Sequence, residues 1–372
     1  MKEKIFLSTP HLNGKEIAFI KKAIDTNWIA PLGENVDKFE NILCDYVGIN
    51  YSLALSSGTA ALHLALSVIG VRRNDYIFCS DLTFVASANA ISYLNAIPVF
   101  IDSEKKSWNM CPRALELAFE KYNPKAVIVT DIYGQSANYK EIVEICKKKN
   151  VFIIEDAAES LGAQYDGKKC GSFGDISILS FNGNKIITTG GGGMLLSNNE
   201  SFVKKAKKLS TQARENEFHY EHKELGYNYR LSNILAGIGI GQMYTLDENV
   251  EKRRNIYEFY KNELKSFSDI EFMPEIKNGR STFWLSSLII KNKSHDFIEK
   301  KIKNFTNENV EVRPVWKPMH MQPLYNKNPF IYYDNKPVSE LLFEHGLCLP
   351  SGSNLLENQL QRIVNLFKEN LN

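Results

Sequence analysis

One lysine of this 372-residue chain stands in a setting that suggests chemistry. In the stretch SFNGNKIITTGGGGM, Lys185 follows a hydrophobic run, and four glycines, Gly190 to Gly193, lead into the next one. Glycines allow close approach of the backbone, which an ordinary loop does not need. A lysine amine held in a partly dry place can act as a nucleophile toward an aldehyde. A surface lysine kept for solubility is the commoner alternative.

Two further polar groups follow hydrophobic runs upstream. Asp156 ends the run VFIIED, and a buried carboxylate needs a partner, for which a pyridinium nitrogen would serve. Capping of the next turn explains Asp156 equally well in isolation. Ser56, Gly58 and Thr59 stand in SSGTAALHLAL, where a strand gives way to a helix whose free N–H groups could bind an anion. Simple helix capping is the alternative there.

Together these groups match one cofactor. An anion cradle, a buried carboxylate and an enclosed lysine suit the phosphate, the ring nitrogen and the aldehyde of pyridoxal 5'-phosphate (PLP, or PMP in its aminated form). Phe84, at another strand end, could stack on the ring, although a core phenylalanine would look the same. The sequence therefore predicts a PLP enzyme with Lys185 and Asp156 as its catalytic residues.

The elements that must position these residues alternate between residues 50 and 200. Short apolar runs such as AVIVT and VFII are separated by helical patterns, which predicts an α/β fold with a largely parallel sheet covered on both faces. Ligands of such sheets bind beyond the carboxyl ends of the strands, where the candidate residues stand.

The pattern changes in the second half of the chain. One long helix is expected from Leu231 to about Phe267, followed by strands at FWLSSLII and VEVRPVW. A helix near Phe297 to Phe305 and a C-terminal helix from Leu355 to Leu371 complete a smaller α+β lobe. We expect a large PLP-binding domain over residues 1–250, including the N-terminal segment, and a small domain over residues 251–372.

Composition restricts the remaining classes of function. A net charge of +2 gives no field that favours nucleic acid or a membrane surface as a partner. The six cysteines are scattered and form no zinc-type spacing, so we expect no metal and a reducing compartment. No run is long enough to span a bilayer, and the first residues lack a secretion-signal core, so we expect a cytoplasmic protein.

Seven segments of the chain, in this order, carry a resemblance to a known family: SSGTAALHLAL, TFVASANAI, YGQ, EDAAES, GSFGDISILSFNGNKIITTGGGGM, GYNYRLSN and RPVWKPMH. From about residue 6 onward, the chain is similar to the DegT/DnrJ/EryC1/StrS sugar aminotransferases, a branch of the fold-type I, aspartate aminotransferase-like PLP enzymes. The resemblance implies a large domain with a mostly parallel seven-stranded sheet, a smaller C-terminal α+β domain, and a homodimer with active sites at the subunit interface.

The resemblance also implies roles for single residues. Lys185 would bind the coenzyme covalently and move protons, and Asp156 would keep the ring nitrogen protonated. Ser180 would help Gly58 and Thr59 to hold the phosphate, and Asn228 would reach it from the neighbouring subunit. The full cofactor-binding set is Ser56, Gly58, Thr59, Phe84, Asp156, Ala158, Ser180, Lys185 and Asn228.

Within the family, NWIAPLG and STQAREN look most like enzymes of bacillosamine-type pathways, which aminate C4 of a UDP-linked 4-keto-6-deoxy-N-acetylhexosamine with L-glutamate as donor. Close alternatives are dTDP-keto-sugar 3- or 4-aminotransferases and a regulatory PLP-binding paralogue without catalysis. Asp131 and Glu159 stand where many relatives carry histidine, which leaves the role of Asp131 open. The substrate-binding candidates are Trp28, Ile29, Glu159, Arg214, Arg230, Arg313 and His320. Arg230 could instead lock the dimer, and His320 could simply pack between prolines.

Overall fold

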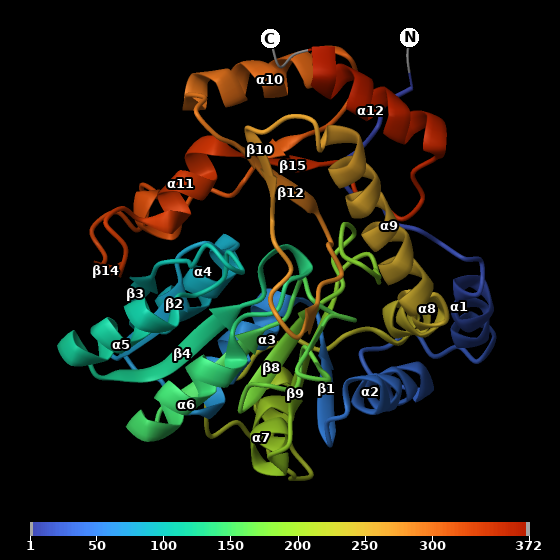
Figure 1. The fold of residues 1–372 in the computed structure, drawn as a ribbon. Helices are drawn as coiled ribbons and strands as arrows, with labels where there is room; N and C mark the ends of the chain where they lie inside the picture. Colours follow the sequence, from blue (N-terminus) through green and yellow to red (C-terminus); the bar gives the residue numbers. More distant parts are fainter. Residues whose placement is uncertain (1–2, 370–372) are drawn as a thin grey trace.

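A computed structural model describes residues 3–369 of the chain. It has a large lobe built on one sheet and a smaller lobe at one end of it, formed mostly by the last third of the chain (Figure 1). Within residues 3–369 the main sheet has eight strands, in the order β1-β9-β8-β5-β4-β2-β3-β14. These strands are β1 (Tyr51–Leu55), β2 (Tyr76–Ser80), β3 (Ile97–Ile101), β4 (Pro124–Thr130), β5 (Phe152–Asp156), β8 (Ile176–Ser180), β9 (Gly193–Ser197) and β14 (Phe330–Ile331).

The main sheet is mostly parallel, as the alternating pattern predicts. Strands β14, β3, β2, β4, β5 and β8 pair in parallel, whereas β9 runs antiparallel to both β8 and β1. The central strands are buried on both faces, which explains their continuous Val and Ile runs. The predicted α/β fold is confirmed. The short strand β14, which adds an edge to the seven expected strands, has too little sequence pattern to be predicted.

Helices cover both faces of this sheet (Figure 1). The large lobe is completed by α1 (Glu16–Asp25), α2 (Glu34–Val47), α3 (Gly58–Val68), α4 (Val85–Tyr93), α5 (Pro112–Lys121), α6 (Tyr139–Lys149), α7 (Glu200–Ser210) and α8 (Asn233–Met243), with the short helix η1 (Ile132–Gly134). A minor sheet pairs β6 (Gln164–Tyr165) with β7 (Lys168–Lys169) and β11 (Gly279–Arg280).

The small lobe packs helices against a second sheet of order β10-β12-β15-β13. Its elements are α9 (Leu246–Leu264), β10 (Ile270–Phe272), β12 (Ser286–Ile290), α10 (His295–Asn307), β13 (Arg313–Pro314), η2 (Met319–Met321), α11 (Val338–His345), β15 (Gly346–Leu349) and α12 (Glu357–Glu369). The C-terminal helix was expected to reach Leu371, which lies outside the described residues.

The expected long helix from Leu231 to Phe267 is wrong as one element. The chain breaks it between α8 and α9, where Thr245 has φ −122° and ψ 11°. The first half carries Gly237, Gly239 and Gly241, and Cβ atoms at those positions would collide with α1 or α2. The glycines allow α8 to pack closely against the N-terminal helices, a tertiary contact that the helical pattern does not contain.

Two segments cross between the lobes. Ile5 pairs with Val310 and lies in the core of the small lobe, and β14 brings residues of the C-terminal part to the edge of the main sheet. The division into domains at residue 250 stays a prediction. The two crossing segments connect the parts of the chain on either side of it. Among residues 3–369, no helix combines the length and the apolar character that crossing a membrane requires.

Candidate active site

A cavity of about 900 Å³ opens where strands of the main sheet end, and residues of the small lobe close its other side. It brings together ten of the candidate residues from distant parts of the chain. These are Ser56, Gly58, Thr59, Phe84, Asp156, Ala158, Glu159, Ser180, Lys185 and Arg313. The carboxyl ends of β1, β5 and β8 supply most of them, as expected for a doubly wound sheet.

Lys185 lies in the turn between β8 and β9 and points its amine into the enclosed part of the cavity. Its side chain is 12% exposed, and Nζ lies 3.2 Å from Oε1 of Glu159. The same nitrogen lies 4.2 Å from the ring centroid of Trp284. The amine is therefore held by a carboxylate on one side and an aromatic face on the other.

Asp156, the last residue of β5, is almost completely buried at the cavity floor. Its Oδ2 accepts a hydrogen bond of 2.6 Å from the Ser87 hydroxyl, and its Oδ1 accepts one from the N–H of Ala158. Burial raises the pKa of Asp156, while the Ser87 hydroxyl and the charge of Lys185 oppose this rise. A cationic partner inside the cavity, such as a protonated ring nitrogen, would stabilise the ionised carboxylate.

The anion cradle lies at the N-terminus of α3. The Ser57 side chain caps this helix by accepting from the N–H of Ala60. N–H groups in the first turn of a helix have no partner inside the helix, so those of Gly58 and Thr59 can bind an anion. A Cβ on Gly58 would come within 3.2 Å of the Ser180 side chain, which shows how tightly the loop after β8 packs on the cradle.

These groups fit PLP by their chemistry. Donors for a phosphate, a buried carboxylate for a ring nitrogen and an enclosed amine for an aldehyde line one cavity. Phe84 has 56% of its surface exposed despite its size, and its ring tilts against Trp316 at a centroid distance of 5.5 Å. An exposed aromatic ring on the cavity wall is available to contact a flat ligand.

Comparison with known proteins identifies the family. A model of the DegT/DnrJ/EryC1/StrS aminotransferase family matches residues 10–368. The chain belongs to this family. Its cofactor is pyridoxal phosphate, which agrees with the donor groups in the cavity.

Relatives of this aminotransferase cover nearly the whole chain. EpsN of Bacillus subtilis (strain 168), named as a candidate pyridoxal phosphate-dependent aminotransferase, is 50% identical over 98% of this chain and 95% of its own length. A GDP-perosamine synthase of Escherichia coli O157:H7 is 35% identical over 97% and 96%. The UDP-4-amino-4,6-dideoxy-N-acetyl-beta-L-altrosamine transaminase of Campylobacter jejuni (strain 81-176) is 34% identical over 87% and 86%.

Solved structures share the fold of this aminotransferase. A DegT DnrJ EryC1 StrS aminotransferase from Brucella abortus is 27% identical and superposes with a TM-score of 0.87 over 95% of both chains. The PMP form of Spr1654 from Streptococcus pneumoniae has a TM-score of 0.91 over 99% of this chain and 98% of its own, and at 23% identity it bears on the fold alone.

Several candidate residues of the aminotransferase lie outside this cavity. Trp28, Asn228 and Arg230 line a second, more open hollow of about 1050 Å³ on the outer surface. Arg230 pairs there with Glu40 at 3.2 Å, and its side chain is only 5% exposed. Ile29 is 61% exposed. Within one chain the structure therefore does not bring these residues to Lys185.

The remaining basic candidates have partners within the chain. Arg214 lies over the ring of Tyr220 at 4.2 Å, in the segment between α7 and α8. Arg313 stands at the cavity rim and forms two hydrogen bonds with Oε1 of Glu311, while 63% of its side chain stays exposed. Its second guanidinium edge can still meet a ligand at the rim.

His320 is absent from the residues that line the described cavity. Its Nδ1 lies 2.8 Å from Asp81 and its Nε2 lies 3.1 Å from Glu340 of α11. Its ring stacks on Phe330 with a centroid distance of 3.8 Å. These contacts join the end of β2 to the small lobe, so in this structure His320 serves interlobe packing.

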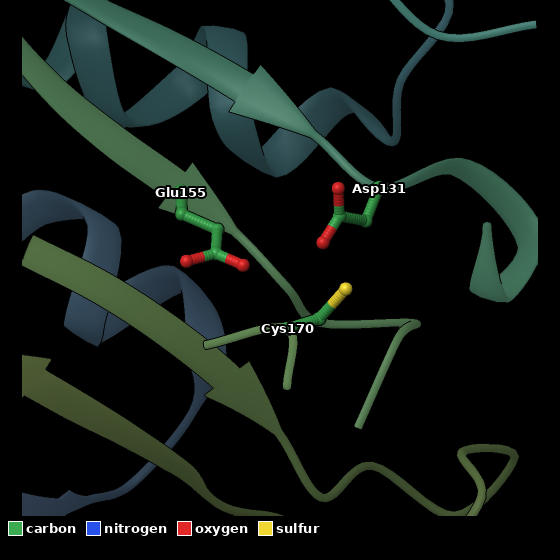
Figure 2. A group of neighbouring side chains, drawn as sticks. All are labelled: Asp131, Glu155 and Cys170. Atoms are coloured by element: carbon green, nitrogen blue, oxygen red, sulfur yellow. The ribbon is translucent and has the colours of Figure 1, made fainter. Parts of the chain in front are cut away.

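Asp131, whose role the sequence left open, belongs to a buried cluster behind the cavity. Figure 2 shows its carboxylate facing Glu155 and Cys170, with ligand atoms of the three residues within 4.8 Å of one another. The carboxylate of Asp131 accepts hydrogen bonds from Ala137, Tyr139 and Ser160. These bonds assign Asp131 to structure, because they tie the loop after β4 to the segment after β5.

Two contacts of the site were missed in the sequence. Ser87 lies in the first turn of α4, and only the fold shows that its hydroxyl reaches Asp156. The sequence places Trp284 in the predicted strand FWLSSLII, yet it precedes β12 and covers Lys185 from 99 positions away. A local pattern carries no signal for either contact, since the first depends on how α4 packs beside β5 and the second on how the lobes pack.

Proposed function

We propose that this protein transfers the amino group of L-glutamate to C4 of a UDP-linked 4-keto-6-deoxy-N-acetylhexosamine. The product would be UDP-4-amino-4,6-dideoxy-N-acetylglucosamine, a precursor for surface glycans or glycoproteins. The observation that carries the proposal is the position of Lys185, enclosed in one cavity with Asp156 and the anion cradle of α3. The UDP-sugar transaminase among its relatives supports the choice of substrate.

The coenzyme supplies reversible attachment of an amino group and a ring that accepts electrons from the carbon bearing it. The residues of the chain position it and move protons. Asp156, fixed by Ser87, would hold a proton on the ring nitrogen, which keeps the ring electron-accepting. Lys185, when its amine is free, would move the proton that the reaction transfers, because its amine is enclosed in the same cavity as Asp156 and the anion cradle.

The open rim of the cavity suits an anionic nucleotide. Arg313 and Lys317 bring two positive charges to this side, and Phe84 and Trp316 offer aromatic faces. Arginine donates in pairs to a diphosphate. A GDP-linked keto sugar is the second candidate, since a GDP-perosamine synthase matches 97% of the chain.

We also propose that the enzyme acts as a homodimer. Asn228 and Trp28 lie in an outer hollow away from the cavity of their own chain, which agrees with a role in the site of a second copy. The test mixes Lys185→Ala and Asn228→Asp subunits. If Asn228 serves the neighbouring site, the mixed dimer regains one intact site and part of the activity. Two inactive variants that stay inactive after mixing would exclude the shared site.

The direct experiment incubates the purified protein with L-glutamate and a panel of UDP-, GDP- and dTDP-linked keto sugars. Mass spectrometry and NMR identify any amino sugar and the position of its new amine. The proposal predicts product from the UDP-linked 4-keto sugar, and none from the Lys185→Ala protein. Preference for a GDP- or dTDP-linked sugar would refute the proposed substrate, and absence of any amino sugar with all of them would refute the aminotransferase activity.

A further inference from the structure

The amine of Lys185 sits in a small compartment with two walls. One wall is the carboxylate of Glu159, 3.2 Å away, and the other is the ring face of Trp284, 4.2 Å from Nζ. Both residues are at most 3% exposed. An ammonium group in such a dry place is costly unless a negative charge and a polarisable ring face stabilise it, and this compartment provides both.

The Glu159 wall is fixed by bonds that do not involve Lys185. Its second oxygen, Oε2, accepts a 2.8 Å hydrogen bond from the N–H of Tyr133. Tyr133 has φ 52°, a left-handed conformation that is unfavourable for a bulky residue, and it is fully buried. The Tyr133 hydroxyl accepts from the N–H of Trp316. The surrounding fold therefore holds the backbone N–H of Tyr133 toward the carboxylate of Glu159.

The Trp284 wall is fixed independently as well. Its indole N–H donates to the carbonyl of Asn184 at 2.7 Å, and its ring stacks beside Tyr133. The backbone carbonyl of Trp284 accepts from the buried guanidinium of Arg253 in α9. Both walls would thus remain in place when the lysine moves away, which distinguishes a built compartment from side chains that collapse around an amine.

We propose that Trp284 and Glu159 form a holding site for the amine of Lys185 when it is not attached to the coenzyme, and that they stabilise this amine in its protonated form. Trp284 is then a positioning residue that acts through Lys185. The holding site keeps the detached amine inside the cavity, in one orientation and away from the rim. This inference rests on the proposed attachment of the coenzyme to Lys185 and is independent of which sugar is the substrate.

The first test uses the enzyme with ¹⁵N-labelled tryptophan. The chain has four tryptophans, and the indole signal of Trp284 is assigned by its loss in Trp284→Phe. The signal is compared between the pyridoxal form, in which the amine is attached, and the pyridoxamine form, in which it is free. Lys185→Met loaded with the same two coenzyme forms gives the change caused by the coenzyme alone.

The holding site predicts a larger change of the Trp284 signal in the wild type than in Lys185→Met. Equal changes in the two proteins would overturn it. If borohydride fails to fix the coenzyme to Lys185 in the wild type, the proposed function fails. If borohydride fixes the coenzyme to Lys185 but the Trp284 signal changes equally in the wild type and in Lys185→Met, only the holding site is refuted.

The second test separates positioning from substrate binding. Trp284→Leu should lower kcat roughly 2- to 30-fold, the range that corresponds to an enclosed cation–π contact, with KM for the keto sugar unchanged. Trp284→Phe, which keeps a ring, should recover most of kcat. An unchanged kcat, or a raised KM alone, would contradict the role. If Trp284→Leu does not fold, Glu159→Gln replaces it in the NMR comparison, where the Trp284 signal should change less between the two coenzyme forms than it does in the wild type.

Discussion

At the scale of single residues, the sequence indicates which groups can do chemistry, and the structure indicates what surrounds them. Lys185 and Asp156 could be identified from the sequence as catalytic candidates because each ends a buried strand or follows it closely. A charged side chain without a partner rarely occupies such a position. Ser87 and Trp284 could not be identified in this way, since a serine in a helix and a tryptophan beside a strand are both common in proteins without any catalytic role. Their roles arise only from contacts between distant segments.

Replacing Asp156 by asparagine tests the role of its carboxylate charge. The change keeps the size and the hydrogen bond from Ser87 possible, but removes the charge that would stabilise a protonated ring nitrogen. We expect kcat to fall by about 100-fold or more, as for loss of a proton-positioning group. Steady-state kinetics on the coenzyme-loaded protein measure this. Asp166→Asn, at an exposed turn, is the matched control, and equal activity of both variants would contradict the role.

At the scale of elements, a largely parallel sheet with helices on both faces was predictable because apolar runs and helical patterns alternate regularly. The order of the strands and the break between α8 and α9 were not, because they depend on contacts between distant segments, such as the close approach of α8 to α1 and α2. The four-glycine run shows the same dependence on packing. A Cβ on Gly193 would lie 2.4 Å from the backbone N of Gly58, whereas one on Gly191 would meet nothing within 4 Å.

These two glycines give a matched pair of variants. Gly193→Ala should force β9 away from the start of α3, lowering the free energy of unfolding by about 1–3 kcal/mol or more and weakening coenzyme binding. Gly191→Ala should leave the free energy of unfolding nearly unchanged, because its Cβ would meet no protein atom within 4 Å. Thermal unfolding and titration with pyridoxal phosphate measure the two effects. Equal behaviour of the pair would show that the cradle is not tightly packed against β9.

At the scale of the whole molecule, the two lobes are joined by contacts that no pattern in the sequence predicts. His320, one of the substrate-binding candidates, bridges Asp81 and Glu340. Burial would lower the pKa of His320, but the hydrogen bonds and charges of Asp81 and Glu340 outweigh it and raise the pKa above its usual 6.5. Asn228 lines an outer hollow apart from the cavity, and the proposed homodimer would bring a second copy to it.

The raised pKa of His320 predicts how interlobe stability depends on pH. Because the folded protein binds the proton more tightly than the unfolded chain, the stabilisation is complete below about pH 6.5 and is lost as pH rises through the folded pKa. The difference in urea midpoint between the wild type and His320→Gln should therefore be largest near pH 6 and shrink toward about pH 9. A difference in urea midpoint that grows with pH would contradict a raised pKa of His320 in the folded protein.

The central claim is that the amine of Lys185 meets the aldehyde of pyridoxal phosphate in the cavity that holds Asp156. Borohydride reduction of the protein loaded with the coenzyme, followed by peptide mass spectrometry, tests it most directly. The account predicts one stoichiometric coenzyme adduct on Lys185, absent from Lys185→Ala and retained in the exposed control Lys168→Ala. An adduct on another lysine, or no adduct, would contradict it.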